Sequence, residues 1–314
     1  LLGFPEAIIL LNPSAIENYM LPETAKVWYN GKMSTVGEAK VSLLTHALHY
    51  GSSVFEGMRA YATEDGPAIF MLDAHIDRLF YSARSIFMEM PYSKEEIKDA
   101  CSQVVRENGL SAAYIRPVVF YGDENMGLNP SNNQVHVAII AWEWGRYLAD
   151  EVSVKIASLK RISEQSLTVD AKVGGHYVNS IQATIEAKRM GFDEALLLDH
   201  DGYIAEGPGE NIFFISGNRI VTPRLGKVLR GITRQAVITL AQDLNYEIEE
   251  RNVTPHEIDG FEGAFFTGTA AEISPIKQIG TISYDTSKGT DIAEAFHSTA
   301  TGKGSRSKEW LSWC

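Results

Sequence analysis

The spacing of hydrophobic residues along the chain alternates between the two-residue repeat of strands and the longer repeat of helices. Residues 25–33 alternate around Asn30-Gly31, a dipeptide that favours a two-residue hairpin turn. Further apolar runs that are short enough for strands are residues 68–72, 113–120 and 135–141. The first half of the chain is therefore predicted to open with an antiparallel sheet.

Two amphipathic helices are predicted among these strands. Apolar residues recur at helical spacing after Asp73, which is the predicted N-cap of the first helix. The second helix follows Ser93, which is expected to form a capping box with Glu96. Strands and helices together predict an α/β unit in this half.

The second half of the chain shows the same change of period. A helix is predicted from His176 to Gly191, a glycine typical of helix C-termini. Another helix follows Gly231, and one more is predicted to begin at Thr254, Pro255 and Glu257. The remaining apolar runs predict hairpins over residues 195–207 and 212–222 and a strand over 264–266.

A break in the periodicity at residues 142–150 marks the predicted domain boundary. The predicted organisation is a small N-terminal α/β domain at 1–143, an interdomain loop at 144–152 and a larger C-terminal domain at 153–314.

The composition of the 314 residues, with 45% hydrophobic and 22% charged, is that of a globular protein. A net charge of −12 argues against nucleic acid or an anionic membrane as a partner. Cys101 and Cys314 form no disulfide framework and no zinc spacing, so a reducing compartment, the cytoplasm, is expected. No apolar run approaches the ~20 residues of a membrane span, and residues 7–11 are too short for a signal peptide.

Candidate chemistry concentrates between residues 171 and 211. Lys172 is followed by Val173, two glycines, His176 and Tyr177, and the hairpin downstream delivers Glu206 beside a glycine. A lysine is a covalent catalyst once it loses its proton, and glycines would let the backbone approach a flat ligand. An amine, a phenol and an isolated carboxylate are the groups that pyridoxal phosphate chemistry requires.

Each of these residues taken singly has a plainer interpretation: a solvated lysine, a packing tyrosine, a glycine turn. Their joint occurrence favours the catalytic interpretation. His46 and His49 would share a helix face and offer two metal ligands, but without a third ligand they are better interpreted as hydrogen-bonded histidines. We therefore predict no metal site.

Motifs throughout the chain carry a resemblance to a known family. They are HALHYGSSVFEGMRAY at 46–61, HIDRL at 75–79, AYIRP at 113–117, GLNP at 127–130, EGPGEN at 206–211, RGITR at 230–234 and TGTAAEI at 267–273. With the lysine segment, they make the chain resemble the class IV, or fold-type IV, aminotransferases, and among these the branched-chain amino acid aminotransferases. The resemblance implies an α+β fold of two domains, the larger with a β-barrel-like core.

The resemblance also implies the cofactor and its ligands. Lys172 is expected to bind pyridoxal 5′-phosphate covalently, with Tyr177 on the ring oxygen and Glu206 on the ring nitrogen. Arg78, Ile232, Thr233 and Thr269 are expected to bind the cofactor phosphate, and Leu229 and Gly231 are also expected to bind the cofactor. A glycine before a helix start is compatible with this role, because the first N–H groups of a helix attract anions.

The substrates implied are L-leucine, L-isoleucine and L-valine, with 2-oxoglutarate as the amino acceptor, giving branched 2-oxo acids and L-glutamate. The expected substrate residues are Tyr50, Phe55, Arg59, Tyr114, Arg116, Trp144, Tyr147, Thr269 and Ala270. Met126 and Leu128 are expected to reach a neighbouring subunit's pocket, which implies a homo-oligomer of at least two chains and leaves a hexamer open.

Alternatives of two kinds remain open at this point. A D-amino acid or (R)-amine transaminase, or an aminodeoxychorismate lyase, would share the scaffold, although AYIRP and VFEGMR favour the branched-chain type. A non-enzymatic phosphate- or nucleotide-binding protein is disfavoured, because no GxxxxGK[ST] and no GxGxxG between strand and helix is present. A serine hydrolase lacks its G-x-S-x-G.

Overall fold

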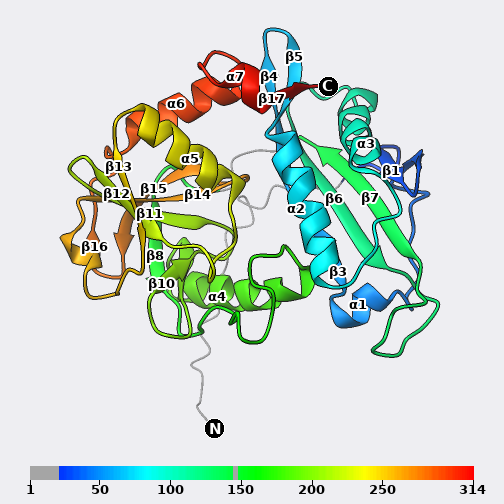
Figure 1. Ribbon diagram of the computed structural model, residues 1–314, viewed down its shortest axis with the longest axis horizontal. Helices are drawn as coiled ribbons and strands as arrows, with labels where there is room; N and C mark the ends of the chain where they lie inside the picture. Colours follow the sequence, from blue (N-terminus) through cyan, green and yellow to red (C-terminus); the bar gives the residue numbers. More distant parts are fainter. Residues whose placement is uncertain (1–20, 144–147) are drawn as a thin grey trace.

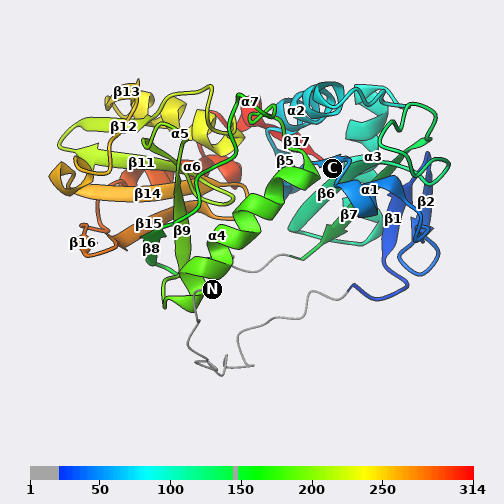
Figure 2. The same ribbon diagram turned by 90° about the horizontal axis from the view of Figure 1, so that it is seen from below.

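The computed structural model describes residues 21–143 and 148–314. The chain forms two sheets, each covered by its own helices, and the two units lie side by side (Figure 1). Viewed from below, helix α4 of the second unit points toward the first (Figure 2). This arrangement agrees with the α+β fold expected from the sequence.

The first sheet is antiparallel, and its strands within the described residues follow the order β17-β5-β4-β6-β7-β1-β2, with β3 beside β6. Asn30 and Gly31 take φ values of 49° and 88° in the first turn, which confirms the predicted hairpin. The strands are β1 (Lys26–Tyr29), β2 (Lys32–Thr35), β3 (Ser53–Phe55), β4 (Met58–Thr63), β5 (Gly66–Phe70), β6 (Ala113–Tyr121), β7 (Val135–Trp142) and β17 (Leu311–Trp313).

The helices of this unit are α1 (His46–Tyr50), α2 (Leu72–Ser85) and α3 (Lys94–Glu107). The capping box of Ser93 and Glu96 is present, as predicted. The prediction of Asp73 as the N-cap of α2 was wrong, because Met71 holds that position and Asp73 lies in the first turn. The Met71 N–H donates to the Trp310 carbonyl at 2.6 Å, so a residue at the C-terminal end of the chain helps to set where this helix begins.

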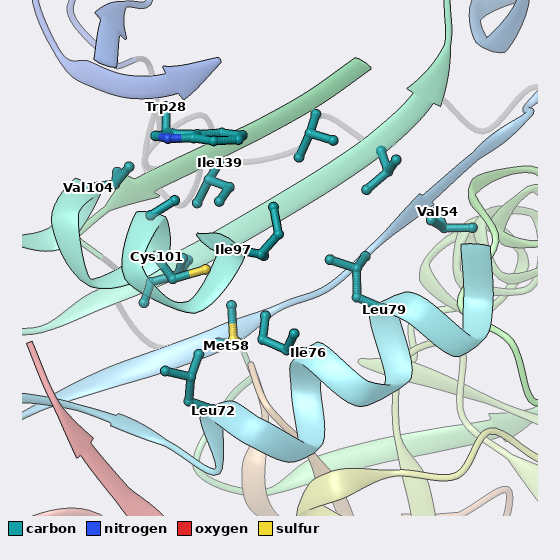
Figure 3. Close-up of a cluster of buried hydrophobic side chains, with 14 of the residues drawn as sticks. Trp28, Val54, Met58, Leu72, Ile76, Leu79, Ile97, Cys101, Val104 and Ile139 are labelled. Atoms are coloured by element: carbon teal, nitrogen blue, oxygen red, sulfur yellow. The ribbon is translucent and has the colours of Figure 1, made fainter. Parts of the chain in front are cut away.

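The core of the first unit lies between the sheet and helices α2 and α3 (Figure 3). Ile76 and Leu79 of α2 meet Ile97 and Val104 of α3 over Met58 of β4. All five side chains are buried. Burial of such a side chain contributes about 1.5–3 kcal/mol, so this packing holds α2 firmly against the sheet.

The second sheet closes on itself. Its order is β10-β9-β8-β15-β14-β11-β12-β13, with β16 beside β15, and β10 also pairs with β11. The closure confirms the predicted barrel-like core, and Glu206 lies at it, opposite Asn211. The strands are β8 (Val152–Ile156), β9 (Glu194–Leu198), β10 (Ile204–Glu206), β11 (Asn211–Ser216), β12 (Arg219–Pro223), β13 (Glu247–Arg251), β14 (Gly263–Gly268), β15 (Glu272–Ile279) and β16 (Ile282–Ser283).

Helical segments surround this barrel. They are the 3₁₀ turn η2 (Gly174–His176), α4 (Tyr177–Arg189), α5 (Ile232–Asp243), the 3₁₀ turn η3 (Ile258–Gly260), α6 (Thr290–Ala300) and α7 (Ser307–Trp310). The prediction of a helix beginning at Thr254, Pro255 and Glu257 was wrong, because only the 3₁₀ turn η3 forms there. Glu257 accepts a hydrogen bond from the Thr254 N–H as a cap would, but Phe261 is already extended.

The two units share a small core of their own. Trp310 of α7 packs with Phe70 of β5 and with Leu240 of α5 and Phe296 of α6. The chain then ends in β17, which pairs with β5 in the first sheet. Among the described residues, no helix has the length and apolar character needed to cross a membrane.

Candidate active site

A cavity of about 390 Å³ is lined by residues of both units. Thirteen of the residues expected around the cofactor and substrate line it: Phe55, Arg78, Tyr114, Arg116, Lys172, Tyr177, Glu206, Leu229, Gly231, Ile232, Thr233, Thr269 and Ala270. These residues come from segments as far apart as β3 and the β14–β15 turn. The fold therefore brings most of the sequence-derived site into one place.

Lys172 lies just before η2, where the chain turns into α4. Its Nζ is 2.6 Å from the Tyr177 hydroxyl and lies over the Phe55 ring, 4.9 Å from the centroid. Its backbone is tied to the first unit on both sides, because the Phe55 N–H donates to the Lys172 carbonyl and the Lys172 N–H donates to Ser82 Oγ. The amine is thus held at a fixed point between the two units.

The glycines after Lys172 serve the packing of the two units, which differs from the predicted role against a flat ligand. A Cβ at Gly174 would collide with Ser53 Oγ. A Cβ at Gly51, which has φ +66°, would lie 2.7 Å from the Gly175 Cα. Gly51 and Gly175 let two backbones approach closely here, a tertiary contact that the local sequence does not reveal.

Glu206 offers a buried carboxylate to the same cavity. It accepts hydrogen bonds from the Asn211 side chain at 2.9 Å and from the Leu229 N–H at 3.0 Å, and it pairs with Arg161. Burial raises the pKa of Glu206, and the charge of Arg161 opposes this rise. The carboxylate is therefore fixed in orientation at the point where the barrel closes.

Arg161 is a functional candidate that the sequence analysis did not identify. It lines the cavity and donates from Nη2 to the Val169 carbonyl at 2.8 Å as well as to Glu206. Nothing in its local sequence distinguishes it from a surface arginine. Its role depends on the approach of two segments 45 residues apart.

The start of α5 also lines the cavity. Gly231 is the N-cap, and no side chain caps this helix. Thr267 Oγ1, also in the cavity wall, is buried without a hydrogen-bond partner among the described residues. A helix N-terminus, an orphaned hydroxyl and Arg78 in one cavity fit a phosphate group. Thr267 was not predicted, although it stands two residues before Thr269.

The residues present fit pyridoxal phosphate. One cavity contains the orphaned Thr267 hydroxyl, Arg78 and the start of α5 as well as Lys172 and Glu206. Amine, carboxylate and phosphate ligands are the three anchors that this cofactor uses. The described residues contain no group of histidine, cysteine, aspartate and glutamate side chains that could hold a metal ion.

Arg116 and two aromatic rings form another wall. The Arg116 guanidinium lies 4.8 Å from the Phe55 ring centroid and donates from Nη2 to the Tyr114 hydroxyl at 3.1 Å. Tyr114 and Arg116 are two apart on β6, and both line the cavity, as the strand period predicted. The Arg116 Nε has no hydrogen-bond partner among the described residues.

Several predicted site residues do not line the cavity. Arg59 forms an ion pair with Glu272 at 3.2 Å and lies over the Tyr61 ring. Tyr50 is half exposed, and its hydroxyl donates to the Met126 carbonyl at 3.1 Å, while the Leu128 side chain is 83% exposed. Trp144 and Tyr147 lie outside the described residues.

Glu210, in the cavity wall, gives a prediction for stability. Burial, reinforced by the charge of Glu194, raises the pKa of Glu210 to about 8. A raised folded-state pKa adds stability that is complete below the unfolded pKa and is lost as the pH rises toward the folded value.

We therefore expect the stability of the Glu210→Gln variant relative to the wild type, both free of cofactor, to be higher at pH 8.5 than at pH 5.5 by about 3 kcal/mol. Urea unfolding at both pH values measures the difference. An unchanged difference would show that Glu210 ionises normally in the folded protein.

The chain matches the family model described as "Amino-transferase class IV" over residues 53–279. The matched region contains every residue named above as a wall of the cavity. The chain therefore belongs to the class IV aminotransferases.

Two curated relatives indicate which enzymes of this class the chain resembles. The branched-chain-amino-acid aminotransferase of Pseudomonas aeruginosa is 44% identical over 293 residues, which cover 90% of this chain and 95% of the relative. The Escherichia coli enzyme of the same name is 37% identical over 296 residues, which cover 91% of this chain and 96% of the relative.

Solved structures agree. The T.th. branched-chain amino acid aminotransferase complexed with N-(5′-phosphopyridoxyl)-L-glutamate is 41% identical, with a TM-score of 0.88 over 93% of this chain and 99% of the other. The Escherichia coli branched-chain amino acid aminotransferase is 36% identical, with a TM-score of 0.88 over 92% and 99%. The expected fold is thereby confirmed, and the chain falls among the branched-chain enzymes of its class.

Proposed function

We propose that the chain transfers the amino group of L-leucine, L-isoleucine and L-valine to 2-oxoglutarate, with pyridoxal phosphate bound at Lys172. The observation that carries the proposal is the single cavity in which Lys172, Tyr177, Glu206 and the start of α5 meet. The relatives named branched-chain-amino-acid aminotransferase, at 37–44% identity, support the substrate class.

The cofactor would be held at three points. Lys172 would supply the covalent anchor, Glu206 would pair with the ring nitrogen and Tyr177 would donate to the ring oxygen. The phosphate would lie against Arg78, the start of α5 and Thr269. Pyridoxal phosphate, when bound, supplies an electron sink for the charge that develops at the substrate Cα.

Proton transfer falls to Lys172. The free Lys172 amine would carry the proton at the substrate Cα. The 2.6 Å contact with the Tyr177 hydroxyl supports this role, because it holds Nζ at one place in the cavity. Glu206 would hold a proton at the ring nitrogen of the cofactor.

The cavity wall that contains Phe55 and Arg116 must accept the aliphatic side chain of one substrate and the carboxylate side chain of the other in turn. Phe55 and Tyr177, with ring centroids 4.9 Å apart, offer an apolar surface for a branched aliphatic group. Arg116, beside Phe55, would receive the side-chain carboxylate of glutamate or 2-oxoglutarate. Tyr114, Thr269 and Ala270 would hold the α-carboxylate.

Arg116→Leu tests this division of roles. We expect the KM for 2-oxoglutarate to rise about 10- to 100-fold, because a charge-assisted hydrogen bond contributes ~1.5–3 kcal/mol. The KM for L-leucine should change by less than about threefold, since its side chain carries no charge to pair. Steady-state kinetics with each substrate varied measures both, and equal increases would contradict the assignment.

We further propose a homo-oligomer of at least two chains. Leu43, Leu44 and Leu48 at α1 are more than half exposed, and so are Val178 and Ile181 on α4. Apolar surface of this kind is typical of interfaces. The exposed Leu128 on the 122–129 loop supports the expectation that Met126 and Leu128 reach the pocket of a neighbouring subunit. Sedimentation equilibrium would find a single chain if this were wrong.

We also propose that the chain divides into an N-terminal domain at 1–143, an interdomain loop at 144–152 and a C-terminal domain at 153–314. Strand β17, at the end of the chain, pairs with β5 of the N-terminal domain. Cytoplasmic location is also proposed, and the two free cysteines, Cys101 and Cys314, suit a reducing compartment.

The proposed activity is tested with a panel of amino donors against 2-oxoglutarate. We expect turnover with L-leucine, L-isoleucine and L-valine, and none with D-leucine or (R)-1-phenylethylamine. Turnover of only the D-amino acid or the amine would assign the chain to the alternative activities of the scaffold.

A further inference from the structure

Glu56 is a wholly buried carboxylate that lies between Phe55 and Gly57, two residues of the cavity wall. Its Oε1 accepts from Arg78 Nε at 2.6 Å. Its Oε2 accepts from Arg78 Nη2 at 2.9 Å and from His75 Nδ1 at 2.7 Å. The two Arg78 contacts form a bidentate fork, which fixes the plane of the guanidinium as well as its position.

The charges of this cluster are defined by its surroundings. Burial alone would raise the pKa of Glu56, but the charge of Arg78 and the hydrogen bonds from Arg78 and His75 hold that pKa far below its usual range. Burial lowers the pKa of His75, which leaves its ring neutral. Glu56 and Arg78 are therefore one anion and one cation, and His75 is a neutral donor to the anion.

Helix α2 supplies both donors from one face. His75, Arg78 and Ser82 follow each other at helical spacing, about a quarter turn away from the face that Ile76 and Leu79 pack into the core. Ser82 on this face accepts from the Lys172 N–H at 2.9 Å. The same helix face thus supports the lysine segment and the Glu56 cluster.

The remaining donors of Arg78 point to the start of α5. A guanidinium has five N–H groups, of which two are used by Glu56 and one by the Arg230 carbonyl, 2.9 Å from Nη1. Arg230 immediately precedes Gly231, the N-cap of α5. One N–H on Nη1 and one on Nη2 are left for an anion at that helix start.

We propose that Glu56 is the positioning residue of the cofactor phosphate site. It holds the back of the Arg78 guanidinium so that the two unused N–H groups face the phosphate, and His75 in turn holds the carboxylate. The inference rests on the proposed function, because it takes the phosphate to be that of pyridoxal phosphate. Glu56 itself does not touch the ligand.

Two effects of removing Glu56 oppose each other. Loss of a negative charge near the phosphate would strengthen the attraction of Arg78 for the phosphate. Loss of the bidentate fork would leave Arg78 free to turn and without its partner. The fork is made at 2.6 and 2.9 Å in a dry site, where oriented hydrogen bonds to charged groups are strong, so the loss of orientation dominates.

The test compares pyridoxal phosphate with pyridoxal, which lacks the phosphate, in absorbance titrations of the full-length cofactor-free protein. In Glu56→Gln, the Kd of pyridoxal phosphate should rise about 10- to 100-fold, and the Kd of pyridoxal by less than about threefold. Asp199→Asn removes another buried carboxylate, one that pairs with Lys227 and does not line the cavity, and it should leave the ratio of the two Kd values unchanged.

Glu56→Asp keeps the charge but shortens the side chain, so it should give a smaller rise of the same kind. This variant also tests the positioning role of Glu56 if Glu56→Gln does not fold. An equal loss for both ligands, or tighter binding of pyridoxal phosphate, would overturn the positioning role. Failure of the wild type to bind pyridoxal phosphate would instead overturn the proposed function.

Discussion

Replacing Lys172 by alanine is expected to abolish the covalent attachment of pyridoxal phosphate. The rate of transamination should fall by about 10²- to 10⁴-fold, the range typical of a lost proton-transfer group. The physical reason is that Lys172 Nζ is the amine held 2.6 Å from the Tyr177 hydroxyl in the cavity. Borohydride reduction followed by peptide mass spectrometry measures the attachment, which in the wild type should fall on the peptide that contains Lys172.

Lys160→Ala is the matched control. Lys160 is exposed, donates to the His200 carbonyl at 2.8 Å and lies outside the cavity wall. It should keep wild-type attachment and activity. Cofactor found on another lysine, or near-normal activity of Lys172→Ala, would remove Lys172 from the proposed mechanism.

Glu206→Gln is expected to have the second-largest effect. An amide cannot keep a proton on the ring nitrogen, so the electron sink weakens and kcat should fall on the order of 10²- to 10³-fold, as for the loss of other preorganised electrostatic groups. The ¹⁵N chemical shift of ring-labelled cofactor reports the proton directly. We expect a protonated ring nitrogen in the wild type and an unprotonated one in the variant.

The variant also deprives Arg161 of its anionic partner, and a buried charge without a partner destabilises the fold. Urea unfolding therefore accompanies the kinetics. Should the variant remain folded with its ring nitrogen still protonated and its kcat unchanged, another group must face that nitrogen.

Features with a local cause could be predicted well from the sequence. The Asn30-Gly31 turn requires positive φ at both residues, and the Ser93 and Glu96 capping box depends on residues three apart. Neighbouring residues decide each of these, so pattern alone was sufficient.

Features with a distant cause could not be predicted. The N-cap of α2 depends on the Trp310 carbonyl, and the role of Arg161 depends on Glu206. The prediction for Arg59 rested on resemblance, and its partner Glu272 lies in the other unit. Glu56 stood inside a recognised motif, yet only the approach of α2 reveals that its carboxylate is buried against Arg78.

The proposed reaction can be seen in the absorption spectrum of the protein with pyridoxal phosphate, before and after one equivalent of L-leucine or D-leucine. We expect the band of the lysine-bound cofactor to convert to that of pyridoxamine phosphate with L-leucine and not with D-leucine, and Lys172→Ala to show neither the band nor the conversion. Conversion by D-leucine alone, or the absence of lysine-bound cofactor in the wild type, would refute the proposed function.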